Sequence, residues 1–262
     1  MKRILITVSG GRTSGYMAIR LWKKYKHMFD MRFVFANSSQ EHEKTLEFVH
    51  NIEKKFGLPI IWIEAKVDPV KGKGTTYTIT NFKKAKRKGE VFEEVIKKYG
   101  LPSMVHLHCT RELKINPMLK LCKDLGCEEQ ALGIRVDELN RYNPRKGFIH
   151  PLIEMFPCDK KKILKWWKKQ KFDLEIPEHL GNCTWCYKKS DTKLNKLVAE
   201  HPEVFDFPLK MEDKYKNAGS GDGDRKIFRG KRTAGEVLAG VQAGETKDSC
   251  AEECGSYIPE GD

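Results

Sequence analysis

The sequence lacks any apolar run close to the roughly 20 residues that a membrane-spanning helix needs. Its basic beginning, Met1-Lys2-Arg3, is followed by an apolar stretch, residues 4–8, that is too short for a secretory signal peptide. Internal repeats are also absent, which argues against a solenoid or propeller. We therefore expect a cytoplasmic protein that does not associate with a membrane.

The composition has little in common with that of disordered chains, because 39% of the residues are hydrophobic and 32% are charged. A chain of 262 residues can bury most of its apolar surface without disulfides. Acidic residues are in deficit, and the formal net charge is +13. This excess favours a polyanionic partner, such as nucleic acid or nucleotide phosphates, and a basic surface that only confers solubility is the alternative.

Disulfides are not expected among the eight cysteines, because the cytoplasm is a reducing compartment. Cys183 and Cys186 form a Cys-x-x-Cys pair, in which two thiolates can bind one metal centre, and such pairs favour zinc or an iron–sulfur cluster. Cys122, Cys127 and Cys158 are expected to be ordinary core or surface thiols.

Short apolar runs alternate with helical periodicity at the start of the chain. Residues 4–8, 33–36 and 59–63 are typical of strands buried on both faces, and residues 13–25 and 41–56 are typical of helices. This alternation predicts an α/β fold with a doubly wound, mostly parallel sheet and right-handed crossovers. Further along, we expect a strand over residues 129–134 and helices over residues 90–99, 112–125 and 159–171.

Two lysine-rich segments, residues 83–88 and 160–171, stand apart from this pattern. The second carries Trp166 and Trp167, which can stack on bases, although adjacent side chains of a helix point in different directions and at least one is expected in the core. Beyond Cys186 the strand pattern is lost. We therefore expect an α/β domain over residues 1–175 and a cysteine-bearing C-terminal region over residues 176–262.

A glycine-containing loop joins the first strand to the first helix. Its glycines let the backbone approach an anion closely, and the helix that follows offers N–H groups and the positive end of its dipole. The loop has neither the Gly-Lys-Ser/Thr ending of a Walker loop nor the Gly-x-Gly-x-x-Gly of dinucleotide-binding folds. An ordinary tight turn is the alternative to an anion site. The loop consists of Ser9, Gly10, Gly11, Arg12, Thr13 and Ser14.

The loop resembles the PP-loop, Ser-Gly-Gly-x-[Asp/Thr]-Ser, of the adenine nucleotide α-hydrolase superfamily. Five further segments resemble motifs of one branch, the phosphoadenosine phosphosulfate (PAPS) reductase family, and they follow one another in the family's order. The similarity extends over about residues 4–190. The five segments are residues 35–45, 109–117, 133–141, 150–166 and 181–186, and the last contains a variant of the family's Gly-Cys-x-x-Cys.

This resemblance implies that the phosphates of an adenine nucleotide, ATP or PAPS, lie against Ser9, Gly10, Gly11, Arg12, Thr13 and Ser14. It also implies that Asn37 lies near the ribose or adenine, at the carboxyl end of a strand. Lys114, Arg135 and Arg141 are implied as phosphate or sulfate clamps, and a solvated charge is the alternative for each. With ATP, Mg²⁺ is expected to neutralise the departing pyrophosphate.

The resemblance further implies a metal centre. Cluster-containing reductases supply a Cys-Cys pair in addition to the Cys-x-x-Cys, and here Thr110 stands at the second position of that pair. We therefore expect a [4Fe–4S] cluster held by Cys109, Cys183 and Cys186, with one iron open or loosely held by Cys254. A zinc site that combines Cys183 and Cys186 with Cys250 and Cys254, or no metal at all, stays open.

Three functions are compatible with these features, and the catalytic candidates are Lys114, Arg135 and Cys254. The intact Ser-Gly-Gly loop favours an ATP-dependent enzyme that releases pyrophosphate, adenylates an acceptor and inserts sulfur. The lysine-rich segments favour tRNA, other RNA or DNA as that acceptor. Glu253-Cys254-Gly255 resembles half of a reductase signature and favours a sulfonucleotide reductase, an oxidoreductase whose cysteine attacks the substrate sulfur. A non-enzymatic nucleotide or nucleic-acid binding module is the third function, although such a module does not need clustered thiols.

Overall fold

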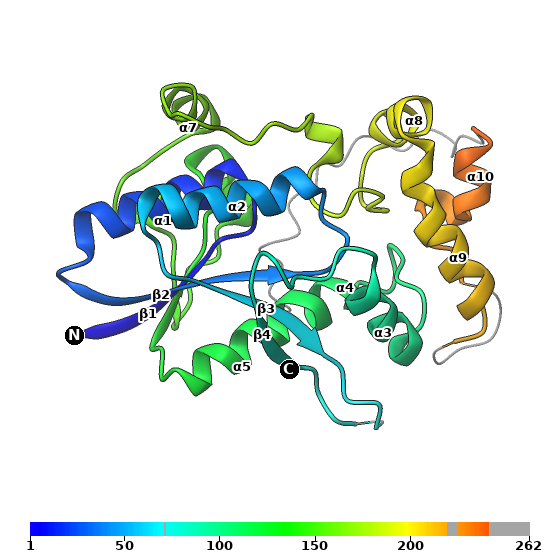
Figure 1. The fold of residues 1–262 in the computed structure, drawn as a ribbon, viewed down its shortest axis with the longest axis horizontal. Coiled ribbons are helices and arrows are strands. Elements are labelled where there is room, and N and C mark those ends of the chain that lie inside the picture. The colour runs from blue at the N-terminus through cyan, green and yellow to red at the C-terminus, as the bar shows by residue number, and fades with distance from the viewer. Residues whose placement is uncertain (71, 219–224, 241–262) are drawn as a thin grey trace.

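A computed structural model describes residues 1–70, 72–218 and 225–240 (Figure 1). Its six-stranded sheet has the order β4-β3-β2-β1-β5-β6, and every neighbouring pair is parallel except β3 and β4. The predicted α/β fold with a mostly parallel sheet is confirmed. The strands are β1 Lys2–Thr7, β2 Phe29–Asn37, β3 Ile60–Lys66, β4 Thr76–Thr80, β5 Glu129–Ala131 and β6 Phe148–Ile149.

Helices cover both faces of the sheet, as Figure 1 shows. Helices α1 (Arg12–Tyr25) and α2 (Glu43–Phe56) lie on one face with α7 (Lys160–Trp167) packed on them, and α5 (Asn116–Asp124) lies on the other. The remaining helices are α3 Glu90–Tyr99, α4 His108–Thr110, α6 Pro151–Glu154, α8 Asp191–Glu200, α9 Asp206–Tyr215 and α10 Ala234–Leu238. Short 3₁₀ turns cover Val136–Arg141, Glu178–Leu180, Pro202–Phe205 and Arg229–Lys231.

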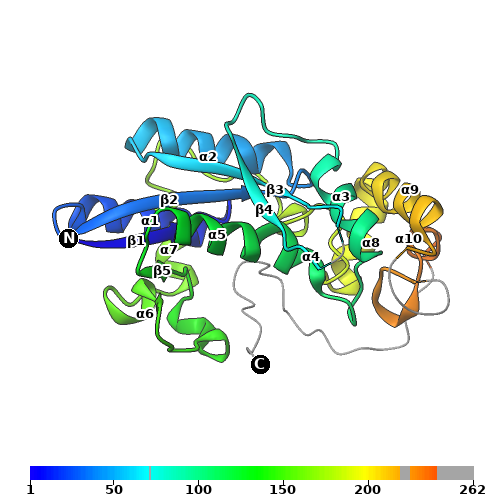
Figure 2. The same ribbon diagram turned by 90° about the horizontal axis from the view of Figure 1, so that it is seen from below.

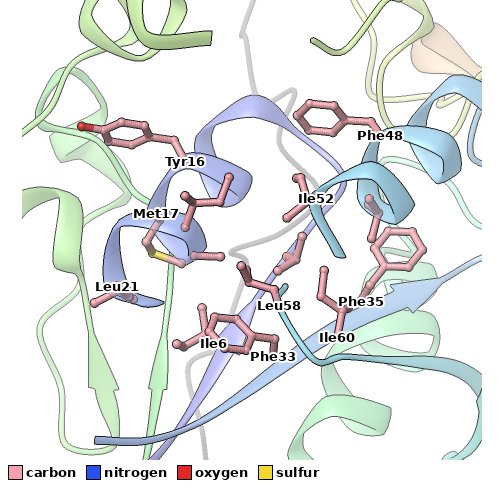
Figure 3. Close-up of a cluster of buried hydrophobic side chains, with 14 of the residues drawn as sticks. Ile6, Tyr16, Met17, Leu21, Phe33, Phe35, Phe48, Ile52, Leu58 and Ile60 are labelled. Carbon is pink, nitrogen blue, oxygen red and sulfur yellow. The ribbon is translucent and has the colours of Figure 1, made fainter. Parts of the chain in front are cut away.

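Strand β1 is buried on both faces because successive side chains point to opposite sides of the sheet. Ile4 and Ile6 pack into the cluster beneath α1 and α2, whereas Leu5 packs into the cluster against α5. Figure 3 shows the first cluster, in which Phe33 and Ile52 lie between the strands and the two helices. The unbroken apolar run in the sequence therefore reflects two cores, one on each side of the strand.

A second large core forms at the end of the molecule where α8, α9 and α10 lie beside α3 (Figures 1 and 2). It combines side chains of residues 91–113, from the middle of the chain, with side chains of residues 180–237. The C-terminal helices are therefore built onto the segment that leads into α5. The domain boundary near residue 175 stays a prediction.

The strand expected over residues 129–134 is shorter, because β5 ends at Ala131. Three further local features differ from the expectations. The helix expected over residues 112–125 begins with a π turn, Arg111–Ile115, because Pro117 lacks the N–H that would bond back to residue 113. Strand β4 was not expected, and it pairs antiparallel with β3 at the sheet edge. Helix α7 is shorter than the expected range, and the Asp159 carboxylate caps it by accepting from the Lys162 amide at 2.7 Å.

None of the helices in the described ranges has both the length and the apolar character that spanning a bilayer requires.

The expectation that at least one of the two adjacent tryptophans is in the core is confirmed. Trp167 is 0% exposed, and its ring lies 4.8 Å from that of Phe48 in α2. We expect Trp167→Ala to lower the free energy of unfolding by about 3–5 kcal/mol, because it opens a cavity beneath α7. Urea denaturation followed by circular dichroism measures this change.

Leu139→Ala is the control, since Leu139 is 58% exposed and its truncation is expected to change stability by less than about 0.5 kcal/mol. Equal effects of the two substitutions would show that α7 does not depend on Trp167 for its packing.

Candidate nucleotide and thiol site

The loop between β1 and α1 is closed by the side chain of Ser14. The Ser9 amide donates to Ser14 Oγ at 2.9 Å, and Ser14 Oγ donates to the Gly11 carbonyl at 3.1 Å. Gly11 is the N-cap of α1, and among the described residues no side chain caps this helix. The backbone N–H groups of the first turn, with about half a positive charge from the helix dipole, are therefore available to an anion.

Two glycines allow the loop to lie close to its neighbours. Gly10 has φ +84°, and a Cβ atom there would approach Thr45 Cγ2 of α2 to 2.5 Å. A Cβ atom on Gly133, in the segment after β5, would lie 3.3 Å from Ser14 Cα. The loop is thus packed between α2 and the end of β5, which fixes the direction of its N–H groups.

A cavity of about 350 Å³ opens at this loop, beside the carboxyl ends of β1 and β5. Five cationic and two acidic side chains line it, so the cavity favours an anionic ligand. The cationic side chains are Arg12, Lys114, Arg135, Arg141 and Lys160, and the acidic ones are Glu41 and Glu178. The structure thus brings the predicted loop together with the three predicted clamps.

Arg135 is held toward the loop by its neighbours. It is 8% exposed, its Nη1 donates to Thr13 Oγ1 at 3.0 Å, and its Nε donates to Asp137 Oδ1 at 2.9 Å. Burial opposes ionisation of Asp137, but the hydrogen bond and charge of Arg135 hold the pKa of this carboxyl below its ordinary value. Arg141 donates to Glu138 at 2.8 Å. The two guanidinium groups are thus oriented by carboxylates of the intervening 3₁₀ turn.

Lys114, on the π turn, also lines the cavity. Its Nζ lies 3.4 Å from Glu41 Oε1, and both side chains are buried. Glu41 Oε2 accepts from the Ser38 amide at 2.9 Å, so the carboxylate is fixed to the end of β2. A buried pair of this kind places the ammonium group precisely, whatever its net contribution to stability.

Asn37 lies behind the cavity and does not line it. Its side chain is 0% exposed, and Nδ2 donates to Glu64 Oε1 and to the Lys86 carbonyl, each at 2.8 Å. It joins β2 to β3 and to the lysine-rich segment 83–88. A direct contact of Asn37 with ribose or adenine stays a prediction.

Arg12 has a role that the sequence reasoning missed. Its Nε donates to Asp173 at 2.7 Å and a terminal nitrogen donates to the Leu174 carbonyl, while its own carbonyl accepts from Trp167 Nε1 at 2.9 Å. These bonds fasten the loop to α7 and to residues 173–177, which we call the wall segment. Leu174, Ile176 and Pro177 of the wall segment form an apolar side of the cavity with Ile163 and Leu164.

The predicted metal ligands lie in the second large core. Cys109 and Cys183 are buried there and Cys186 packs against it. Cys109 Sγ lies 3.2 Å from the Tyr187 hydroxyl, and Cys183 Sγ lies 3.5 Å from Ser38 Oγ. Residues 181 and 182 line the cavity, and Glu41 forms a β-bridge with Cys183, so Cys183 adjoins the cavity.

Across residues 1–70, 72–218 and 225–240, no three or more His, Cys, Asp or Glu side chains form a group able to hold a metal ion. Cys250 and Cys254 lie outside the described residues. The [4Fe–4S] cluster and the attacking role of Cys254 stay predictions.

No family model matches the chain. It is 37% identical over 196 residues to the uncharacterised nin region protein ORF290 of Escherichia phage lambda, a match that covers 72% of this chain and 67% of that protein. The chain belongs to the family of this lambda protein. It is also 23% identical over 220 residues to the uncharacterised protein MJ0066 of Methanocaldococcus jannaschii, covering 78% of this chain and only 40% of the archaeal protein.

Two solved structures are similar to this chain, each with a TM-score of 0.40. One is PAPS reductase from Candida auris, at 17% identity over 64% of this chain and 73% of the other. The second is the U34-tRNA thiolase NcsA from Methanococcus maripaludis with its [4Fe–4S] cluster, at 12% identity over 98% and 78%. A PAPS reductase thus appears among the similar structures, as the motifs predict, but at this TM-score neither likeness carries a further argument.

The geometry of the loop predicts different effects for its two glycines. Gly10→Ala is expected to lower the free energy of unfolding by about 1–3 kcal/mol, because alanine is strained at φ +84° and its Cβ meets Thr45. Gly11→Ala is the matched control, since Gly11 is extended and the nearest atom to its Cβ, Ser9 Oγ, is 3.8 Å away. Urea titrations of both variants give the comparison, and equal losses would contradict the tight packing of the loop.

Proposed function

We propose that this chain is a PP-loop enzyme that binds an adenine nucleotide, ATP, in the cavity and transfers sulfur to a nucleic-acid acceptor. The observation that carries the proposal is the convergence of the Ser9–Ser14 loop, Arg135 and Lys114 on one cavity at the N-terminus of α1. Backbone N–H groups, hydroxyls and cations that meet in this way suit a chain of phosphates.

The arrangement supports attack at the α-phosphorus of ATP. An acceptor oxygen forms a bond to that phosphorus, the bond to pyrophosphate breaks, and negative charge grows on the leaving oxygens. Arg135 and Lys114, held by Asp137 and Glu41, offset this charge without reorienting. Mg²⁺ bound to the triphosphate would share that charge when present.

The position of the thiols supports sulfur transfer as the second step. Cys183 follows two residues that line the cavity and is bridged to Glu41, which also faces Lys114. A hydrosulfide ion, supplied as co-substrate on this side, displaces AMP from the adenylated acceptor. A carbon–sulfur bond forms as the carbon–oxygen bond breaks, and the hydrosulfide proton is released. Sulfonucleotide reduction is the second candidate, and the tail sequence Glu253-Cys254-Gly255 favours it.

The choice of nucleotide is testable by isothermal titration with ATP and PAPS. We expect ATP to bind and to yield AMP and pyrophosphate in the presence of an acceptor. Arg135→Gln should weaken ATP binding by about 10- to 100-fold, the value of one to two charge-assisted hydrogen bonds. Arg141→Gln, at a more exposed side chain, provides a second variant in case the first perturbs folding.

Lys55→Gln, on the exposed side of α2, removes the same charge away from the cavity and should leave binding unchanged. Tight PAPS binding without measurable ATP binding would replace the proposal with the reductase. Binding of ATP without turnover on any nucleic acid would leave a binding module.

The metal prediction is tested by purifying the protein without oxygen and measuring iron, acid-labile sulfide and zinc. We expect iron and sulfide in the native chain, and their loss in Cys109→Ser, Cys183→Ser and Cys186→Ser. Cys122→Ser is the control, because Cys122 lies on α5 in a different core. Stoichiometric zinc without sulfide would support the zinc alternative and remove the cluster from the proposal.

A further inference from the structure

Helix α7 presents one face to the cavity and another to solvent. Lys160, Ile163 and Leu164 line the cavity, as residues at i, i+3 and i+4 share one face of a helix. The neighbouring lysines point into solvent, and they continue past the end of the helix. The exposed lysines at positions 161, 162, 165, 168, 169 and 171 are called the lysine face from here on. It therefore begins at the rim of the cavity and runs away from it.

Most of this charge is not neutralised by the protein. Within the described residues, Lys161, Lys165, Lys168, Lys169 and Lys171 form no ion pair, and no acidic residue occupies the first turn of α7. Asp159 and Asp173, the acids that flank this segment in the sequence, have other partners, since Asp159 caps the helix and Asp173 accepts from Arg12.

The charge pattern is unfavourable for the helix alone. Like charges at i, i+4 of a helix, here Lys161 with Lys165, destabilise that helix. Lysines in the first turn also oppose the helix dipole. A bound polyanion removes both penalties, which makes the lysine face a site for a chain of negative charges.

The apolar surroundings decide which polyanion fits. A helix that lies in a membrane surface needs an exposed apolar face. In α7, Ile163 and Trp167 are buried, and none of the large hydrophobic side chains that are exposed in the described part of the chain belongs to this helix. The cavity end of α7 instead offers Leu164, beside Leu174 and Ile176 of the wall segment. This apolar wall suits the planar face of a base. A nucleic acid carries one base for each charged phosphate, whereas an acidic peptide has no such planar group beside each charge.

We propose that the lysine face of α7 binds the phosphate backbone of a single-stranded nucleic acid and directs one nucleotide into the cavity past Lys160 and Leu164. The inference rests on the proposed function for its chemistry, because it names the acceptor and its path to the activated nucleotide. Trp167 of α7 donates to the Arg12 carbonyl, and Arg12 Nε donates to Asp173 of the wall segment, so the two ligands would be held in one fixed geometry.

The backbone contact is tested with a fluorescein-labelled 20-nucleotide single-stranded DNA and its RNA counterpart, by anisotropy over a salt series. We expect the fourfold variant of the lysine face to bind at least tenfold more weakly than the native chain. The slope of log binding constant against log salt concentration should become less negative by about 0.7 for each phosphate that the variant no longer neutralises. The variant carries K161Q, K165Q, K168Q and K169Q.

A matched control removes the same four charges from exposed lysines that lie on α3, α5 and α9 or directly after α9 and that make no ion pair within the described residues. It carries K97Q, K123Q, K210Q and K216Q, and it should bind both oligonucleotides within twofold of the native chain. Equal weakening in the two fourfold variants would overturn the inference, because it would reflect net charge alone. Equally tight, lysine-dependent binding to phosphatidylserine vesicles at the same salt would also overturn it.

Access of a base to the cavity is tested with 2-aminopurine at the central position of the DNA. We expect its fluorescence to change on binding and Leu164→Ala to reduce that change, while Leu119→Ala, a substitution at a 45%-exposed side chain of α5, leaves it intact. An unchanged signal with bound native protein, or equal effects of both substitutions, would overturn this part of the inference.

ATP titration separates this inference from the proposed function. The fourfold lysine-face variant should bind ATP within twofold of the native chain, because ATP contacts the Ser9–Ser14 loop. If the native chain binds no ATP but binds DNA through the lysine face, the proposed function fails and the surface stands. If ATP binds and the lysine-face variant binds DNA as the native chain does, only the inference fails.

Discussion

Close packing around the Ser9–Ser14 loop constrains the rest of this structure. The loop must lie against α2 at Thr45, against the segment after β5 at Gly133, and against α7 through the Arg12 carbonyl, all at once. These contacts come from three separated parts of the chain, and each fixes one direction in space. The N-terminus of α1 is therefore presented rigidly to the cavity, which is what an anion site without a side-chain cap requires.

The buried cations depend on the same arrangement. Arg135 and Lys114 are 8% and 9% exposed, and such groups are stable only where carboxylates or a ligand compensate for lost hydration. Asp137, Glu138 and Glu41 provide that compensation at 2.9, 3.2 and 3.4 Å. A phosphate chain can then bind between prepositioned charges without first ordering them.

Much of the fold could be predicted from local sequence. Apolar runs, glycines and helical spacing over a few residues predict β1, the loop, α1 and α3. Gly57 ends α2 with φ +65°, as its position after a periodic helix predicts. The edge strand β4 was missed because its alternation lies within a polar, basic stretch. The wall segment was missed because Leu174 and Ile176 become a cavity wall only through Asp173 binding Arg12, a contact between residues 161 positions apart. Nonlocal pairing of this kind leaves no periodic signal.

Glu41 links the two chemistries that the sequence motifs suggested separately. Its side chain faces Lys114 in the nucleotide cavity, and its backbone is bridged to Cys183 in the thiol-containing core. The neighbouring Gln40 strengthens the link, because its carbonyl accepts from the Thr184 amide at 3.1 Å and its side-chain oxygen accepts from Trp185. The segment that carries the Cys-x-x-Cys is thus attached to the end of β2 by backbone and side-chain bonds. Glu41 therefore positions Lys114 and the backbone of Cys183 together, so the cavity and this cysteine are held at one fixed spacing.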